Sequence, residues 1–365
     1  MAEHARALDV EALRSQFPAL SQLVHGQPLV YLDNAATVQK PACVLEELLR
    51  CYTESCANVN RGAHTLGERA TEGYERARST VQRFLHAASS EELVFTSGCT
   101  AAINLVAHGW GDRHVRQGDE VIVTGLEHHS NLLPWRELCR RRGARLRSVP
   151  IDEQGRLDLE AYARLLGPRT RLVAVAHVSN VLGTLTPLRE LAGLAHAAGA
   201  RILVDGAQAV ARTAVDVQAL DCDFYAFSGH KLYGPFGIGV LWGRRELLES
   251  TEPVFTGGGM VEELSAERAS YRPLPARLEA GTPDTAWASD GCDSLGQSRR
   301  DATPLLARVG PRIAQQHLDT DVVGTGRTML GDPAQDGILV APRDDRVEQS
   351  VAHLAKVLFG EAGAE

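Results

Sequence analysis

Lysine is rare in this chain, and one lysine lies where an enzyme could use its amine. The 365 residues include 35 arginines but only three lysines, Lys40, Lys231 and Lys356. Lys231 belongs to the glycine-rich segment Ser228-Gly-His-Lys-Leu-Tyr-Gly-Pro235. A bias toward arginine explains the scarcity of lysine on the surface, but it does not explain a lysine kept in an apolar segment. The segment predicts an amine that holds an aldehyde cofactor as a Schiff base.

An acidic residue lies upstream of Lys231, at the end of an apolar run. The run 202–204 leads into Asp205, and Gln208 follows shortly after it. A carboxylate that faces the ring nitrogen of a pyridine-type cofactor keeps this nitrogen protonated, which makes the ring an electron sink. Gln208 could reach the phenolic oxygen of the same ring. Desolvation in such a pocket lowers the pKa of a lysine, so Lys231 could also move the α-proton of a substrate.

The elements that would position these residues alternate between strands and helices. Short apolar runs occur at 93–95, 121–123, 172–175, 202–204, 224–227 and 238–241, and amphipathic stretches occur at 101–110, 131–142, 157–166 and 188–198. This alternation predicts an α/β fold with a mostly parallel sheet that is covered by helices on both faces. The carboxyl ends of parallel strands lie at one edge of such a sheet, where ligands bind.

Polar clusters follow five of the apolar runs. They are 96–100, 126–131, 177–180, Asp205 with its neighbours, and 228–231. Serine, asparagine and aspartate at a single strand end are usually turn or capping residues. Five such clusters at one edge of one sheet, with a lysine among them, instead favour a shared crevice.

Two of these clusters hold candidates for binding a phosphate and a ring. The segment Gly98-Cys99-Thr100, between a strand and a helix, could seat a phosphate on free backbone N–H groups, although this signal is weak alone. Ser228 and His230 could donate to the same phosphate. His128 or His129 could stack on the ring, while a lone histidine more often has only a structural role.

Composition favours a globular enzyme over a nucleic-acid-binding or membrane protein. Hydrophobic residues make up 44% and charged residues 23% of the chain, and the net charge is −8. That charge gives no electrostatic reason to bind nucleic acid or anionic lipid. No apolar run reaches the ~20 residues of a membrane span, and residues 1–16 do not resemble a signal peptide, so we expect a cytoplasmic protein. The seven cysteines include no CxxC pair, which argues against structural zinc and a disulfide framework.

The chain resembles the class V aminotransferase group of fold-type I pyridoxal-phosphate enzymes, and most closely the Suf-type cysteine desulfurases. The resemblance extends over residues 10–286. The matching segments are Tyr31-Leu-Asp-Asn-Ala-Ala-Thr37, Asn58-Val-Asn-Arg-Gly-Ala-His-Thr65, Glu127-His-His-Ser-Asn-Leu-Leu-Pro-Trp135, His177-Val-Ser-Asn-Val-Leu-Gly-Thr184, Val204-Asp-Gly-Ala-Gln208, Ser228-Gly-His-Lys-Leu-Tyr-Gly-Pro-Phe-Gly-Ile-Gly239 and Arg277-Leu-Glu-Ala-Gly-Thr-Pro283. In combination these segments are highly specific for the family.

This resemblance implies a fold-type I transferase fold, with a mostly parallel, seven-stranded sheet between helices. We expect an N-terminal segment at 1–20, a large cofactor-binding domain at 21–270 and a shortened α+β C-terminal domain at 271–365. The glycine- and proline-rich stretch 256–285 is expected to form a loop and the connection between the two domains.

The resemblance also implies pyridoxal 5'-phosphate as the cofactor. Lys231 would hold the cofactor as a Schiff base, His128 would stack on its ring, and Asp205 would pair with its ring nitrogen. The other implied contacts come from Gln208 to the phenolic oxygen and from Cys99, Thr100, Ser228 and His230 to the phosphate. Asn180 would lie near the cofactor and the substrate carboxylate. Thr282 would reach the phosphate of a partner subunit, which implies a homodimer with shared sites. No metal site is expected.

The sequence departs from the family in its C-terminal part. The Arg-x-Gly-His-His-Cys segment, whose cysteine carries the persulfide in this family, does not occur after residue 286. Cys292 is the only cysteine there, and it stands too early to match. Smaller departures are Asn60, where the family usually has histidine, and Cys99, where it usually has threonine. The departures leave the nucleophile for sulfur unassigned.

Three functions remain open from the sequence. The first is a cysteine desulfurase that converts L-cysteine to L-alanine and passes sulfur to an acceptor protein for iron–sulfur cluster assembly. The second keeps the cofactor without persulfide chemistry, as a selenocysteine lyase, a C–S lyase that works by β-elimination, or an epimerase. The third is an impaired remnant that binds cofactor or a partner without turnover.

Overall fold

The described part of the computed structural model comprises residues 9–60 and 63–285. The expected C-terminal domain beyond residue 285, including Cys292, lies outside the described residues. The expected domain boundaries therefore stay predictions. Within the described ranges, no helix is both long enough and apolar enough to cross a membrane.

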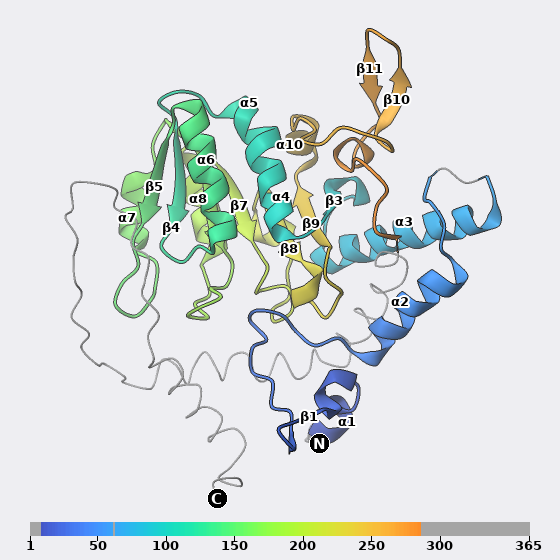
Figure 1. Cartoon of the computed structure of the whole chain (residues 1–365). Helices are drawn as coiled ribbons and strands as arrows, with labels where there is room; N and C mark the ends of the chain where they lie inside the picture. Colours follow the sequence, from blue (N-terminus) through green and yellow to red (C-terminus); the bar gives the residue numbers. More distant parts are fainter. Residues whose placement is uncertain (1–8, 61–62, 286–365) are drawn as a thin grey trace, which may run out of the picture. The chain divides into compact units, whose positions relative to one another are not determined.

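A seven-stranded sheet forms the centre of the described fold (Figure 1). Its strands are β3 (Leu93–Thr96), β4 (Glu120–Thr124), β5 (Arg145–Val149), β6 (Thr170–Ala176), β7 (Arg201–Asp205), β8 (Phe224–Ser228) and β9 (Gly239–Gly243). They are ordered β3-β9-β8-β7-β6-β4-β5, and β9 alone among them runs against its neighbours. The predicted fold class, a mostly parallel seven-stranded sheet, is confirmed.

Alternate side chains of the central strands enter two separate cores. On β4, Ile122 belongs to one core, while Val121 and Val123 belong to the other. Strands β6 and β7 follow the same alternation, because successive side chains of a strand point to opposite faces of the sheet. Both faces of the sheet are thus buried, which explains why its strands read as nearly continuous apolar runs in the sequence.

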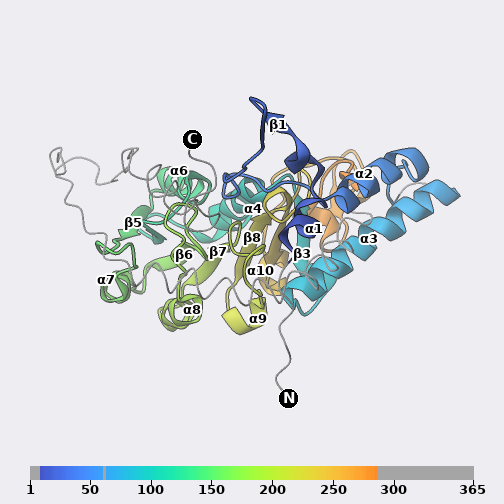
Figure 2. The same ribbon diagram turned by 90° about the horizontal axis from the view of Figure 1, so that it is seen from below.

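Helices cover both faces of this sheet, as Figure 2 shows. One face carries α4 (Cys99–Leu105) and α6 (Leu133–Arg142), and the other carries α7 (Leu159–Leu165), α8 (Leu188–Ala197) and α9 (Val217–Leu220). α4 continues through a π-helical turn (Val106–Gly111) into α5 (Asp112–His114), and α10 (Arg245–Glu249) follows β9. Each of the four predicted helical stretches contains a helix.

The N-terminal part adds elements that precede the sheet. They are α1 (Val10–Arg14), the short hairpin β1 (Leu23–Val24) and β2 (Gln27–Pro28), α2 (Ala42–Glu54) and α3 (Thr65–Leu85). α3 buries Tyr74, Ala77 and Val81 in the same core as Ile122. This spacing places one apolar stripe of α3 against the sheet.

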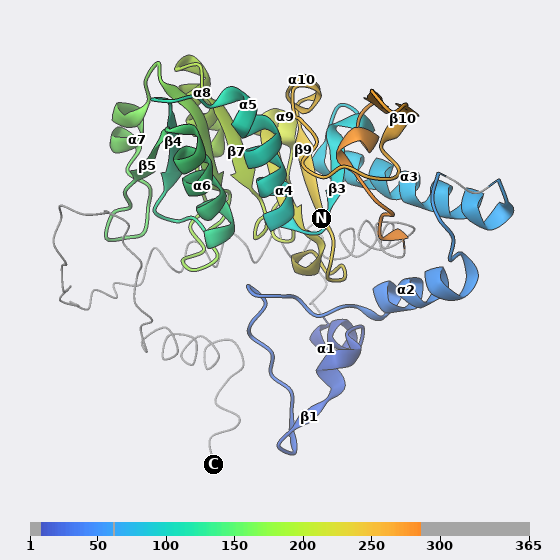
Figure 3. The same cartoon turned by 45° about the horizontal axis from the view of Figure 1, so that its top comes forward.

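The stretch 256–285 contains more structure than the loop that its glycines and prolines predict. β10 (Val261–Leu264) and β11 (Ala269–Tyr271) pair as an antiparallel hairpin, which projects from the rest of the described fold (Figures 1 and 3). After the hairpin, Glu279 fastens the chain to α3. Its two carboxylate oxygens accept hydrogen bonds from the buried Arg78 guanidinium at 2.8 and 2.9 Å. The expected loop is therefore an anchored connection.

Candidate active site

A cavity of about 480 Å³ opens at the edge of the sheet where the parallel strands end. The segments that follow β3, β4, β6, β7 and β8 all contribute to its wall. The predicted site residues that line it are Cys99, Thr100, His128, Asn180, Asp205, Gln208, Ser228, His230 and Lys231. The structure thus brings nine of the ten predicted residues around one space.

Lys231 ends a 3-10 turn, Gly229–Lys231, that directly follows β8. The turn is pinned by the segment after β2, because the carbonyl oxygen of His230 accepts hydrogen bonds from the Val38 N–H at 3.2 Å and from Lys40 Nζ at 3.1 Å. Ser228 lies beside Gly239 on β9. A side chain at Gly239 would lie 2.6 Å from the backbone of Gly98, so only glycine lets these two segments approach so closely.

Asp205 ends β7 with its carboxylate directed to the cavity. The residue is only 7% exposed, and its Oδ1 accepts hydrogen bonds from the Ala207 N–H at 2.9 Å and from the Cys99 thiol at 3.3 Å. No described residue donates to Oδ2, so this oxygen can pair with a ligand. Gly206 must follow Asp205, because a Cβ there would meet the Tyr225 ring at 2.1 Å.

Gln208 is held by contacts at both ends of its amide. Nε2 donates to the Ala35 carbonyl at 2.7 Å, and Oε1 accepts from Arg212 at 2.6 Å. An amide nitrogen carries two hydrogens, so Gln208 keeps one donor for a ligand. Ala35 and Ala36 line the same cavity, and sequence reasoning missed these two as wall residues although they belong to the Tyr31–Thr37 motif.

His128 begins a short turn after β4, and its ring nitrogen caps this turn. Nδ1 accepts from the Ser130 N–H at 3.2 Å, so the neutral ring carries its proton on Nε2. Desolvation first, and then the nearby Lys231 charge, lowers the pKa of His128. The alternative candidate, His129, does not line the cavity in the described structure. His128 therefore offers an uncharged ring at neutral pH.

Ser130 is a wall residue that sequence reasoning missed. Its hydroxyl lies 3.0 Å from His128 Nδ1 and 2.8 Å from the Thr100 hydroxyl. It thereby joins the turn after β4 to the first residues of α4. Its place in the 126–131 cluster was the available signal in the sequence.

The candidate phosphate-binding groups lie together at the start of α4. The Cys99 N–H donates to the Ser228 hydroxyl at 2.8 Å, and Thr100, Ser228 and His230 all line the cavity. His230 stacks on Phe236 with ring centroids 5.4 Å apart. Burial first, and then the Asp205 charge, raises the pKa of the Cys99 thiol well above its usual range. This thiol is a hydrogen-bond donor and not a nucleophile.

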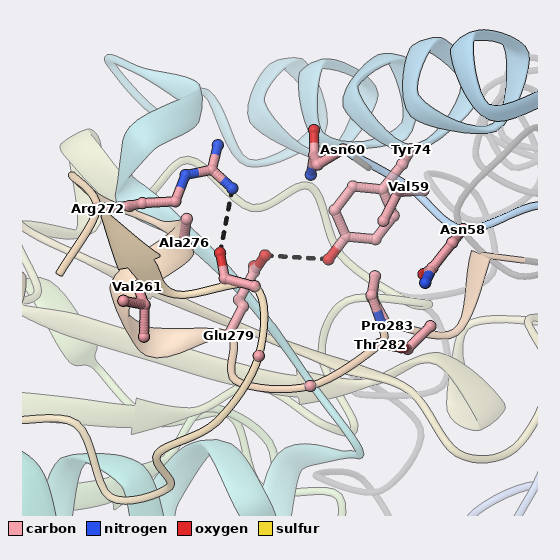
Figure 4. Close-up of a pocket in the computed structure, with 13 residues that line it drawn as sticks. Asn58, Val59, Asn60, Tyr74, Val261, Arg272, Ala276, Glu279, Thr282 and Pro283 are labelled. Carbon is pink, nitrogen blue, oxygen red and sulfur yellow. Dashed lines mark hydrogen bonds between the residues drawn. The ribbon is translucent and has the colours of Figure 1, made fainter. Parts of the chain in front are cut away.

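Thr282 lies away from the Lys231 cavity. It lines a second cavity of about 530 Å³, together with Tyr74, Arg272 and Glu279 (Figure 4). Within that wall the Tyr74 hydroxyl donates to Glu279 at 3.0 Å, and Arg272 donates to the Gly259 carbonyl at 3.1 Å. A single chain does not bring Thr282 to Lys231, so its predicted contact with a partner subunit's cofactor stays a prediction.

The chain is similar to known proteins over most of its length. The sequence profile described as aminotransferase class-V matches residues 30–290. A cysteine desulfurase of Synechococcus elongatus is 51% identical over 284 residues, which cover 78% of this chain and 45% of that protein. A cysteine desulfurase of Dickeya dadantii is 52% identical over 278 residues, which cover 76% of this chain and 68% of that protein.

Solved structures of similar proteins have the same fold. The cysteine desulfurase CsdA of Escherichia coli superposes with a TM-score of 0.73 at 41% identity, over 80% of this chain and 72% of that chain. The apo cysteine desulfurase of Thermococcus onnurineus NA1 gives 0.75 at 38% identity, with the same two coverages. The chain spans less than half the length of some curated relatives, namely 45% of the Synechococcus protein and 43% of a probable cysteine desulfurase of Mycolicibacterium paratuberculosis.

Proposed function

Since the chain belongs to the aminotransferase class-V family, a family of pyridoxal-phosphate enzymes, we propose that the Lys231 cavity is the site of this cofactor. The observation that supports it is the meeting of a lysine amine, a buried carboxylate and a neutral histidine ring around one cavity. The open Oδ2 of Asp205 supplies the acceptor that a protonated ring nitrogen needs. The residues present therefore fit the cofactor.

Different side chains around the cavity would bind different parts of the proposed cofactor. Asp205 would pair with the ring nitrogen, His128 would lie on the ring face, and Gln208 would donate to the phenolic oxygen. Cys99, Thr100, Ser228 and His230 would bind the phosphate, for which the Cys99 N–H would exchange its bond to the Ser228 hydroxyl. Asn180 would lie near the cofactor and the substrate carboxylate. When bound, pyridoxal phosphate supplies an aldehyde that condenses with amines and a ring that withdraws electrons. Lys231 would hold this aldehyde and would accept the α-proton of the substrate amino acid.

We propose cysteine desulfurase activity, in which L-cysteine yields L-alanine while its sulfur atom passes to an acceptor thiol as a persulfide. The Synechococcus and Dickeya relatives carry this name, which supports the substrate. The acceptor would be a sulfur-carrier protein of iron–sulfur cluster assembly, and the enzyme would be a cytoplasmic homodimer. All six described cysteines are free thiols, which suits a reducing compartment.

A second candidate is a β-eliminating lyase, which cleaves the C–S bond of L-cysteine or the C–Se bond of L-selenocysteine, and one observation favours it. The only described cysteine that lines the cavity is Cys99, whose raised pKa and bond to Asp205 exclude it as the sulfur nucleophile. A lyase needs Lys231 and the electron sink, but it needs no thiol. In that reaction L-cysteine and water yield pyruvate, ammonia and hydrogen sulfide.

Product analysis with L-cysteine and L-selenocysteine separates these functions. With a small thiol as acceptor, the desulfurase produces alanine and sulfide in equal amounts, and Lys231→Ala abolishes both products. Pyruvate in place of alanine would assign the lyase. Cys292→Ser tests whether Cys292, the cysteine beyond the six described ones, carries the sulfur. If it does, alanine formation by this variant falls to the level of Lys231→Ala. An absence of all products from cofactor-loaded protein would identify an impaired remnant.

A further inference from the structure

Glu127 directly precedes His128 and the turn that His128 begins, and the proposed chemistry gives it no role. The residue as a whole keeps some exposure, but protein surrounds its carboxylate, and this desolvation raises the pKa of Glu127 to about 8. Three hydrogen bonds reach its two oxygens. Thr124 Oγ1 donates to Oε1 at 2.6 Å, the Ala176 N–H donates to Oε1 at 2.9 Å, and Asn131 Nδ2 donates to Oε2 at 2.6 Å.

The direction of two of these bonds is fixed by a second set of partners. The Trp135 indole N–H can only donate, and it donates to Asn131 Oδ1 at 3.0 Å. Asn131 must therefore present its nitrogen to Glu127. The Leu126 N–H donates to Thr124 Oγ1 at 3.1 Å, which directs the Thr124 hydroxyl proton toward Glu127. Glu127 thus receives donors from the end of β4, the end of β6 and the 3-10 turn His129–Asn131 that precedes α6.

These contacts join two segments of the cavity wall that follow the neighbouring strands β4 and β6. The turn that Glu127 and Asn131 close contains His128 and Ser130, which both line the cavity. Ala176, whose N–H binds the same carboxylate, lines the cavity as well. The Ser130 N–H bond to His128 Nδ1 exists only while this turn keeps its shape.

We propose that Glu127 is a positioning residue, which holds the turn that carries His128 against the ends of β4 and β6 and thereby fixes the ring of His128 over the cavity. The importance of that ring depends on the function proposed above. The geometry of the turn does not depend on that function, so the role of Glu127 and the proposed function can be disproved separately.

Glu127→Gln, alone and together with Asn131→Asp, tests the proposal, because the directions of the hydrogen bonds to Glu127 are fixed. In Glu127→Gln, the amide oxygen can still accept from Thr124 and Ala176, but the new nitrogen faces the Asn131 nitrogen, so two donors meet. Asn131 cannot turn, because Trp135 holds its oxygen. Adding Asn131→Asp to Glu127→Gln restores an acceptor for both the indole and the amide, so the double variant has every bond satisfied.

The reactivity of the His128 ring reports its position without any need for turnover. The unprotonated ring nitrogen attacks a carbonyl carbon of diethyl pyrocarbonate, and in the wild type this nitrogen is the Nδ1 that accepts from the Ser130 N–H. The modification rate is measured by peptide mass spectrometry on the full chain, without cofactor and with pyridoxal phosphate. His86, whose side chain is 65% exposed, serves as the reference in the same sample.

We expect Glu127→Gln to raise the rate ratio of His128 to His86 about 5-fold, the value of one lost hydrogen bond. The double variant should return the ratio to within about 2-fold of wild type, because its hydrogen bonds are satisfied again. A general loss of stability would instead raise the modification rate of the buried His177 in the same sample. An unchanged ratio in the single variant overturns the proposal, and so does an equally raised ratio in the double variant.

A second pair of variants decides the matter if Glu127→Gln does not fold. Thr124→Val removes one donor to the carboxylate, while Thr124→Ser keeps its hydroxyl. A raised ratio in the valine variant alone supports the proposal, and an unchanged ratio in both overturns it. If pyridoxal phosphate does not bind to the wild type, the proposed function fails, and the ratios in cofactor-free protein still test the role of Glu127.

Discussion

Cys99 shows how the same residue type can be placed for different chemistry. The thiol is buried and donates to Asp205, so it contributes to the polar network at the end of β7. Cysteine nucleophiles instead need an accessible thiolate with a lowered pKa. The difference matters here, because Cys99 is the described cysteine nearest to the proposed chemistry.

The cysteines should differ sharply in their reaction with an alkylating agent. Because burial and Asp205 raise the pKa of Cys99, we expect iodoacetamide at pH 8 to modify it about 100-fold more slowly than the exposed Cys56. Peptide mass spectrometry of the native protein measures both rates. Comparable rates at the two positions would show that the Cys99 thiol is accessible, and unfolded protein provides the control in which both should react alike.

His177 links pH to stability at the residue scale. It is 6% exposed, its Nδ1 lies 3.0 Å from the Tyr225 hydroxyl, and burial lowers its pKa to about 4. The unfolded chain binds a proton at this position below about pH 6.5, whereas the folded chain does not until about pH 4. Stability from the neutral ring is thus present above pH 6.5 and is lost as the pH falls between these values.

We expect the free energy of unfolding to fall by about 2 kcal/mol from this residue between pH 7 and pH 5. Urea denaturation of wild type and His177→Asn at both pH values measures the contribution. The variant is expected to be less stable at pH 7 and to lose about 2 kcal/mol less on acidification. An equal loss in both proteins would mean that His177 titrates normally.

At the scale of elements, the connection after the hairpin is fixed to α3 by one buried ion pair. Arg78 is 2% exposed, and its guanidinium also lies over the rings of Tyr74 and Phe95 at 5.0 and 4.6 Å. Glu279 additionally accepts from the Phe95 N–H on β3 at 2.6 Å. A single carboxylate thus attaches the segment that carries Thr282 to both a helix and a strand.

Removal of this carboxylate should be costly. We expect Glu279→Ala to destabilise the protein by about 3 kcal/mol, because it leaves the buried Arg78 charge with only the half-exposed Glu75 as an ion-pair partner. The matched control is Glu160→Ala, since the Arg164–Glu160 pair on α7 has side chains 66% and 90% exposed and should change stability by less than about 0.5 kcal/mol. Urea denaturation measures both. A similar small effect for the two variants would contradict the role assigned to Glu279.

Strands whose two faces are buried could be predicted from sequence, and strands that lie elsewhere could not. The middle residues of β4, β6, β7 and β8 are apolar because their side chains enter both cores. β5 (Arg145–Val149) is an edge strand with mostly exposed side chains, so its sequence carries little apolar pattern and it was not predicted. The β10–β11 hairpin is exposed in the same way, and its glycine-rich flanks suggested a loop.

The site could be predicted in part because strand ends carry it. Nine predicted residues line one cavity, since the carboxyl ends of parallel strands share an edge. The position of Thr282 could not be derived in this way, because it follows an irregular segment that the Arg78–Glu279 pair holds in place. Ser130 and Glu127 were missed because their roles depend on hydrogen bonds that residue spacing does not show.

At the scale of the whole molecule, the α/β fold brings one lysine, one carboxylate and one histidine ring to the same cavity. The functional proposal depends on this arrangement. The scarcity of lysine makes the proposal unusually easy to test, because a label on lysine has only three possible positions in the sequence. Lys40 serves as an internal control, because its Nζ donates to the His230 carbonyl and we propose no bond between Lys40 and the cofactor.

The most direct test is reduction of the protein–cofactor mixture with borohydride, followed by peptide mapping. The protein is incubated with pyridoxal phosphate, reduced and digested, and each lysine peptide is examined for a pyridoxyl group. We predict one label per chain on Lys231, with none on Lys40 and none at all in Lys231→Ala. A label elsewhere, or an unmodified Lys231 in protein that retains its fold, would contradict the account.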